Sequence, residues 1–149
     1  MKKKKVVFIA IVSFLIAFSF ILLLVIKLNR PSIRTLEPLT SSQRVEFSNL
    51  EQNLSGGFLN DLDLAREATT ELKSFVEKNP NMEYDGKTGA DVLLNLAKEW
   101  QDLSESQNLA PEKQEVLDTY LLYLQMYPNH QEADEAKRYL RTNGVEPPD

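Results

Sequence analysis

The polar stretch between positions 81 and 86 contains the first residues whose spacing could do chemistry. Asn81, Glu83, Asp85 and Gly86 match positions 1, 3, 5 and 6 of a calcium-binding loop. Position 12 of such a loop supplies a bidentate glutamate, but here that position is Val92. Because the ion would lose two of its ligands, we interpret the stretch as a polar turn and predict no metal site and no cofactor.

The single histidine, His130, is the next candidate. A catalytic triad needs a histidine that is held by an acid and lies beside a nucleophile. His130 falls in an expected loop just before a helix, so we interpret it as a surface residue. The chain has no cysteine, which excludes disulfides, thiolate zinc sites and cysteine nucleophiles. Phosphate-binding glycine motifs are also absent, and we predict that the chain is not an enzyme and has no catalytic residues.

The charges are distributed unevenly along the 149 residues. Residues 1–34 contain seven Lys or Arg and no acid, whereas residues 35–149 contain ten basic and twenty-two acidic side chains, a formal charge of −12. A body this acidic repels phosphate backbones, so we predict no nucleic-acid partner.

The uncharged run 6–26, VVFIAIVSFLIAFSFILLLVI, follows a basic tail at 1–5. Its 21 residues suffice for a helix across the hydrocarbon core, which is about 30 Å thick. A cleaved signal peptide is the alternative, but its apolar region is usually about 7–15 residues and ends at a small-x-small site. No such site ends this run, so we predict an uncleaved single-pass transmembrane helix.

The basic residues around the span favour a cytoplasmic N-terminus, with the C-terminal domain outside the cytoplasm at the cell membrane. Four lysines precede the span, and Lys27, Arg30 and Arg34 follow it. Ala10, Ser13 and Ala17 could let two membrane helices approach closely, which leaves a homo-oligomer open.

The remainder is expected to be all-α, with about five helices and no sheet. Residues 27–40 form a tether, 41–144 a helical domain and 145–149 a tail. The helices are expected from Ser41 or Ser42 to Gly56–Gly57, over 60–78, from about 91, over 111–127, and from Asn129 to Asn143–Gly144. Their apolar stripes are Val45, Phe47, Leu50 and Leu54; Leu64, Ala65, Ala68, Leu72, Phe75 and Val76; Val92, Leu93, Leu96, Ala97, Trp100 and Leu103; Val116, Leu117, Tyr120, Leu121, Leu124 and Tyr127; and Ala133, Ala136 and Leu140.

A 34-residue unit at 97–130 carries a repeat pattern. The matching positions are Trp100, Leu103, Ser104, Val116, Tyr120 and the closing Pro128. This stretch resembles the tetratricopeptide (TPR) family, although Gln107 and Tyr123 depart from its pattern. A weaker match covers 49–82, with Gly56, Ala68, Leu72 and Pro80 in place and Gln52 and Ser55 failing. About fourteen extra residues separate the two units, and the helix after 129 is expected to cap the array.

The resemblance implies non-covalent binding of a protein or peptide, as in membrane-anchored TPR proteins of bacterial envelopes. We expect Trp100, Leu103, Tyr120 and Pro128 to pack the repeat, which leaves the other large aromatics, Tyr123 and Tyr127, as the candidates for partner binding. The acidic surface favours basic partners. The alternative is a structural subunit that packs in a larger membrane complex through both its membrane helix and its body, and an enzyme is a third reading.

Overall fold

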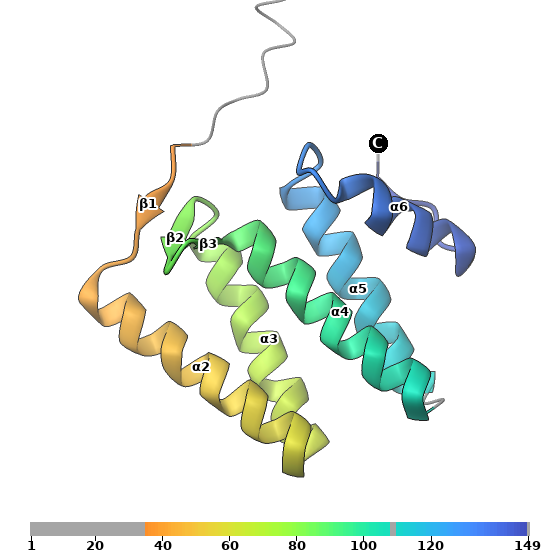
Figure 1. Cartoon of the computed structure of the whole chain (residues 1–149), viewed down its shortest axis with the longest axis horizontal. Coiled ribbons are helices and arrows are strands. Elements are labelled where there is room, and N and C mark those ends of the chain that lie inside the picture. The colour runs from red at the N-terminus through yellow and green to blue at the C-terminus, as the bar shows by residue number, and fades with distance from the viewer. Residues whose placement is uncertain (1–34, 108–109, 149) are drawn as a thin grey trace, which may run out of the picture. The chain divides into compact units, whose positions relative to one another are not determined.

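The computed structural model describes residues 35–107 and 110–148. The helices in this part are α2 (Ser41–Asn60), α3 (Leu62–Lys78), α4 (Gly89–Gln107), α5 (Ala110–Met126) and α6 (Ala133–Thr142) (Figure 1). The short strands are β1 (Glu37–Pro38), β2 (Met82–Tyr84) and β3 (Lys87–Thr88). The prediction of a mainly helical domain with five helices is confirmed. None of the described helices has the length and apolar character to cross a bilayer, and the predicted span 6–26 lies outside the described residues.

The body consists of two helix pairs, α2 with α3 and α4 with α5, followed by α6 against α5. Capping explains how the first pair is built. Thr40 caps α2 in a capping box with Gln43, and the Asp61 carboxylate accepts from the backbone N–H groups of Asp63 and Leu64 at the start of α3. Asp61 is the only residue between α2 and α3, so the chain reverses sharply there.

The two pairs repeat with a period of 48 residues, which separates the starts of α2 and α4 and also those of α3 and α5. The second helices keep the same buried face at this spacing, because Ala68, Leu72 and Phe75 correspond to Val116, Tyr120 and Tyr123, all buried. Both first helices begin eight residues before the predicted units 49–82 and 97–130. The TPR resemblance itself stays a prediction.

The predicted stop at Gly56–Gly57 is wrong, because α2 continues through both glycines to Asn60. Gly57 serves a close helix crossing instead. A Cβ atom at Gly57 would lie 2.4 Å from the backbone nitrogen of Ala65 on α3, so only glycine permits this approach. At Gly56 the same atom would meet nothing within 4 Å.

The prediction of no sheet is also wrong, since β1, β2 and β3 form a small three-stranded sheet. β1 pairs with β2 in parallel, and β2 pairs with β3 through a two-residue turn at Asp85–Gly86. Both turn residues have positive φ, 50° and 75°, as the Asp-Gly type I′ hairpin requires. The residues considered as a calcium loop therefore form a hairpin.

The core lies between the helix pairs and under α6. The predicted stripe Ala133, Ala136 and Leu140 is buried, as expected for a capping helix. Two predicted core residues are exposed instead, Val45 (62% exposed) and Leu64 (38%), because their faces of α2 and α3 point to solvent.

Candidate functional site

A groove of about 230 Å³ runs between α2 and α4, and α3 lies between these two helices in Figure 1. Its floor is apolar, made by Leu54 of α2, Leu72 of α3, and Val92 and Leu96 of α4, all at most 8% exposed. We call this cavity the α2–α4 groove. The floor can accept apolar side chains of a bound segment without the loss of any hydrogen bond.

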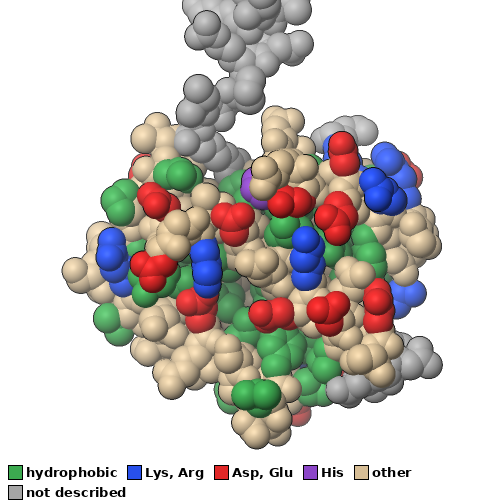
Figure 2. All heavy atoms as spheres, viewed as in Figure 1, with side chains coloured by type: hydrophobic (Ala, Val, Ile, Leu, Met, Phe, Trp, Pro, Cys, Tyr) green, Lys and Arg blue, Asp and Glu red, His purple; other side chains and the backbone are tan. Residues whose placement is uncertain are grey.

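The rim of the α2–α4 groove is charged. It carries Glu51 of α2, Lys87 of β3, and Lys98, Glu99 and Asp102 of α4. Acidic and basic side chains gather over the middle of this face in Figure 2. The α2–α4 groove thus combines an apolar floor with a polar edge, the pattern of sites that recognise amphipathic segments.

The two lysines of the rim already have acidic partners. Lys87 Nζ donates to Glu51 Oε1 at 2.9 Å, and this bond raises the pKa of Lys87. Lys98 Nζ lies 3.9 Å from Glu135 Oε2 on α6. Within residues 35–107 and 110–148, neither Glu99 nor Asp102 has an ion-pair or hydrogen-bond partner for its side chain. The charge that the rim offers to a ligand is therefore negative.

The surroundings of Glu99 in the rim shift the pKa of its carboxyl group. Desolvation, and next the nearby Glu51 carboxylate, raise the pKa of Glu99 above its ordinary value, while Lys87 acts in the opposite direction. A cation placed beside Glu99 would relieve part of that penalty, because it favours the charged form of the carboxylate. The α2–α4 groove is therefore suited to lysine or arginine side chains that flank an apolar segment.

Neither of the tyrosines predicted to meet a partner has a free ring. Tyr123 is fully buried, and its hydroxyl lies 2.7 Å from His130 Nδ1. Burial raises the pKa of Tyr123, so its hydroxyl stays neutral. Tyr127 is half-buried, and its hydroxyl donates to the carbonyl oxygen of Pro80 at 2.8 Å. Tyr123 points from α5 toward the turn before α6, and Tyr127, the residue after α5, points toward the turn after α3, so both pack against the body.

The residues predicted to pack the repeat differ in burial. Trp100 is fully buried and donates through Nε1 to Thr69 Oγ1 at 2.8 Å. Tyr120 is buried and donates to Gln101 Oε1 at 3.0 Å, and burial raises its pKa to about 12. Leu103 is half-buried against the core, and Pro128 is exposed just after α5 ends.

His130 is predicted to be a surface residue, but its side chain is partly buried and contacts three other side chains. Its side chain is 22% exposed, with Nδ1 at 3.0 Å from Glu132 Oε2 and Nε2 at 3.9 Å from Asp91 Oδ1. The hydroxyl group beside His130 belongs to Tyr123, which is fully buried, so a substrate could not reach it. The arrangement ties the turn after α5 to α4, and in the described residues no group of three or more His, Asp or Glu is placed to hold a metal ion.

The α2–α4 groove is not among the sites predicted from the sequence. Glu51 and Lys87 are 36 residues apart, and only the packing of α2 beside the β2–β3 hairpin brings them together. The local signal that could have indicated it is Asp85–Gly86, which fixes the hairpin that carries Lys87. No family model, no curated protein and no solved structure matches the chain.

Proposed function

We propose that the chain is a membrane-anchored protein–protein interaction scaffold of the TPR-like type, which holds a basic protein or peptide segment in the α2–α4 groove. The membrane anchor is the apolar run 6–26, and the helical body is extracytoplasmic. The observation that carries the proposal is the apolar floor beside two unpaired carboxylates, Glu99 and Asp102.

The charge of the body supports a basic partner. Residues 35–149 carry a formal charge of −12, which attracts cationic segments from a distance and speeds their encounter. At the α2–α4 groove the long-range attraction becomes a local one, because lysine or arginine side chains can pair with Glu99 and Asp102. Apolar residues of the same segment would cover Leu54 and Leu96.

Binding can be tested with the full chain in phospholipid nanodiscs. The probe is a fluorescein-labelled amphipathic helical peptide of leucine and lysine, compared with a peptide in which glutamate replaces lysine. Each exposed ion pair contributes about 0.2–1 kcal/mol, so Glu99→Gln/Asp102→Asn should weaken binding of the basic peptide by about 2- to 30-fold.

The matched control is Glu67→Gln/Glu71→Gln, which removes the same charge from exposed positions of α3 outside the groove. Equal weakening by the two double variants, or equal binding of the two peptides, would refute the groove as the site. Equal weakening would leave only general attraction to an acidic body, whereas equal binding of the two peptides would show that charge does not contribute to binding.

The orientation is tested separately, and the absence of native cysteine makes the test clean. Ser55→Cys places one thiol at an exposed position of α2. A membrane-impermeant maleimide should label it in intact cells, together with an outside-facing control protein. Labelling only after the membrane is breached would contradict the extracytoplasmic assignment.

A further inference from the structure

A second cavity, of about 530 Å³, lies between α4 and α6, with the start of α5 at one end. We call it the α4–α6 slot and define it by Gln101, Glu105, Lys113, Glu135, Arg138 and Tyr139. It shares no lining residue with the α2–α4 groove. Its volume falls in the range of about 300–1,000 Å³ that is typical of ligand sites.

The unpaired charges of the α4–α6 slot are positive. Glu105 accepts a hydrogen bond from Gln101 Nε2 at 2.9 Å, and Glu135 faces Lys98 of α4 at 3.9 Å. By contrast, the side chains of Lys113 and Arg138 make no ion pair or hydrogen bond with any residue in the described part of the chain. This is the opposite of the α2–α4 groove, where the acids are left without partners.

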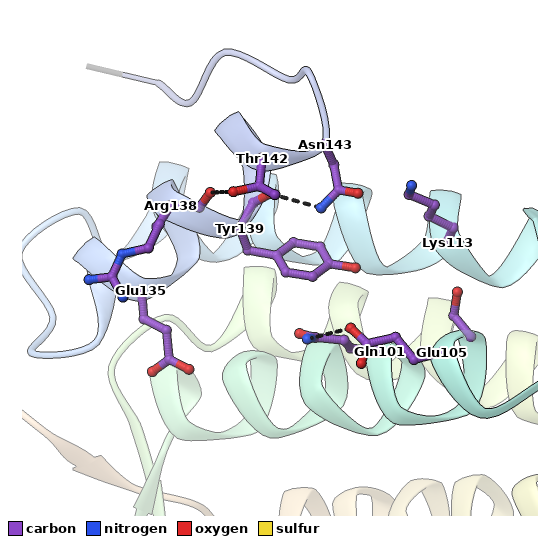
Figure 3. Close-up of a pocket in the computed structure, with 9 residues that line it drawn as sticks. Gln101, Glu105, Lys113, Glu135, Arg138, Tyr139, Thr142 and Asn143 are labelled. Atoms are coloured by element: carbon purple, nitrogen blue, oxygen red, sulfur yellow. Dashed lines mark hydrogen bonds between the residues drawn. The ribbon is translucent and has the colours of Figure 1, made fainter. Parts of the chain in front are cut away.

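Lys113 and Arg138 lie on opposite sides of the aromatic ring of Tyr139. Figure 3 shows the Tyr139 ring between Arg138 and Lys113, with Glu105 below it on α4. The ring is held in place by Tyr120, whose ring centroid is 5.1 Å away. A ligand with one anionic group could reach only one side, whereas an elongated ligand with two separated anions could meet both cations across a rigid surface.

The acidic residues of the slot restrict the ligand further. Glu105 and Glu135 balance the formal charges of Lys113 and Arg138, so the lining is neutral overall. A compact polyanion such as a nucleoside triphosphate would bring several negative charges into a lining with only two cations, so most of those charges would have no partner. Single carboxylates that are spaced apart fit better, and a guanidinium binds a carboxylate through two parallel hydrogen bonds.

We propose that the α4–α6 slot binds an extended acidic peptide segment, with one carboxylate on Lys113, a second on Arg138 and the intervening backbone along Tyr139. The proposal does not depend on the α2–α4 groove, because the two sites use different residues and opposite charges. It adds a second recognition site to the same helical body.

Fluorescence anisotropy with the full chain in nanodiscs tests this proposal. The probes are labelled, end-blocked peptides in which two aspartates are separated by one to four residues, and the reference peptides carry asparagine instead. One spacing should bind best and should lose affinity by about two- to fivefold in Lys113→Gln and again in Arg138→Gln, the loss expected for single exposed ion pairs. Glu105→Gln should bind the same peptide more tightly, because a repulsive carboxylate is removed.

Arg141→Gln is the matched control, since Arg141 lies on α6, is exposed and does not line the slot. Arg141→Gln and Arg138→Gln should also leave binding of the basic peptide to the α2–α4 groove unchanged. The proposal is overturned if Arg141→Gln weakens the acidic peptide as much as Arg138→Gln does, or if no aspartate peptide binds better than its asparagine reference. Binding of free glutarate as tight as that of the best peptide would also overturn it, in favour of a small dicarboxylate.

Discussion

Replacing Thr69 by valine should destabilise the helical body by about 1–2 kcal/mol, because it removes the acceptor of a buried hydrogen bond. Thr69 and Trp100 are both fully buried, and Trp100 Nε1 donates to Thr69 Oγ1 at 2.8 Å. Valine has nearly the same shape as threonine, so the change leaves the indole N–H in place without a partner and without water.

The magnitude follows from two opposing contributions. A buried donor that loses its partner costs about 1–3 kcal/mol. The extra buried methyl group returns about 0.8 kcal/mol at most. The helix propensities of threonine and valine are similar, so the backbone of α3 adds little.

Unfolding of the full chain by urea in mild detergent, followed by far-ultraviolet circular dichroism, gives the change in free energy. Trp100 is the only tryptophan, so its fluorescence reports the same transition from the site itself. In a Trp100→Phe background the donor is gone, and Thr69→Val should then be neutral or slightly stabilising. The coupling between the two changes should be about 1–2 kcal/mol.

Thr119→Val is the matched control. Thr119 is as buried as Thr69, but its hydroxyl donates to the carbonyl oxygen of Glu115 within α5. Helix carbonyls of this kind already accept a backbone hydrogen bond, so no buried group is left without a partner and the cost should stay below about 0.5 kcal/mol. A loss at Thr119 equal to that at Thr69, or a Thr69→Val variant as stable as the native chain, would refute the argument.

Three further predictions concern α2, α4 and the contact of α3 with α5. Gly57→Ala should cost about 1–3 kcal/mol in thermal or urea unfolding, because its Cβ meets the Ala65 backbone, whereas Gly56→Ala in open space should stabilise by up to about 1 kcal/mol; equal effects would contradict the close crossing. Glu99→Gln should stabilise the body by less than about 1 kcal/mol at neutral pH. Burial raises the pKa of Glu99 in the folded state, so the protonated carboxyl stabilises the fold below the ordinary pKa of 4.5, and this stability is lost as the pH rises. The gain in stability of Glu99→Gln should therefore vanish below pH 4.5. A gain that does not change with pH would refute the raised pKa of Glu99. Arg66→Ala should cost about 3 kcal/mol, because it leaves the carboxylate of Glu112, 3% exposed, buried without its cation. In that case Arg66→Ala/Glu112→Met should recover most of the loss in the same unfolding assay, and a double variant as unstable as the single one would count against a buried ion pair.

The second helices could be predicted from sequence because their signal is local. The apolar residues of α3 and α5 recur at three- and four-residue steps, and one face of each helix is buried as that period requires. The short apolar stripe of α6 could be predicted for the same reason. In each case a single helix carries the whole pattern, so no knowledge of its neighbours is needed.

The features that could not be predicted depend on residues distant in the chain. Gly57 reads as a helix stop, and only the position of Ala65 across the crossing shows why α2 continues. In the 34-residue pattern Trp100 and Tyr120 take the packing positions, which leaves Tyr123 as a candidate for partner binding, whereas at the observed period of 48 it corresponds to Phe75 and is buried beside His130. Asp85–Gly86 is a hairpin signal in the sequence, although the same two residues also match positions 5 and 6 of a calcium-binding loop.

The arrangement of the two cavities about α4 has a consequence for specificity. The rim residues Glu99 and Asp102 face the α2–α4 groove, and Gln101 and Glu105, on the same turns of α4, line the α4–α6 slot. A partner that crosses α4 would meet unpaired acids on one side and the unpaired cations Lys113 and Arg138 on the other. Reversing that partner would place like charges together at both sites, which costs free energy twice. If the two proposed sites bind one partner, opposite unpaired charges on the two sides of α4 would specify its direction as well as its composition.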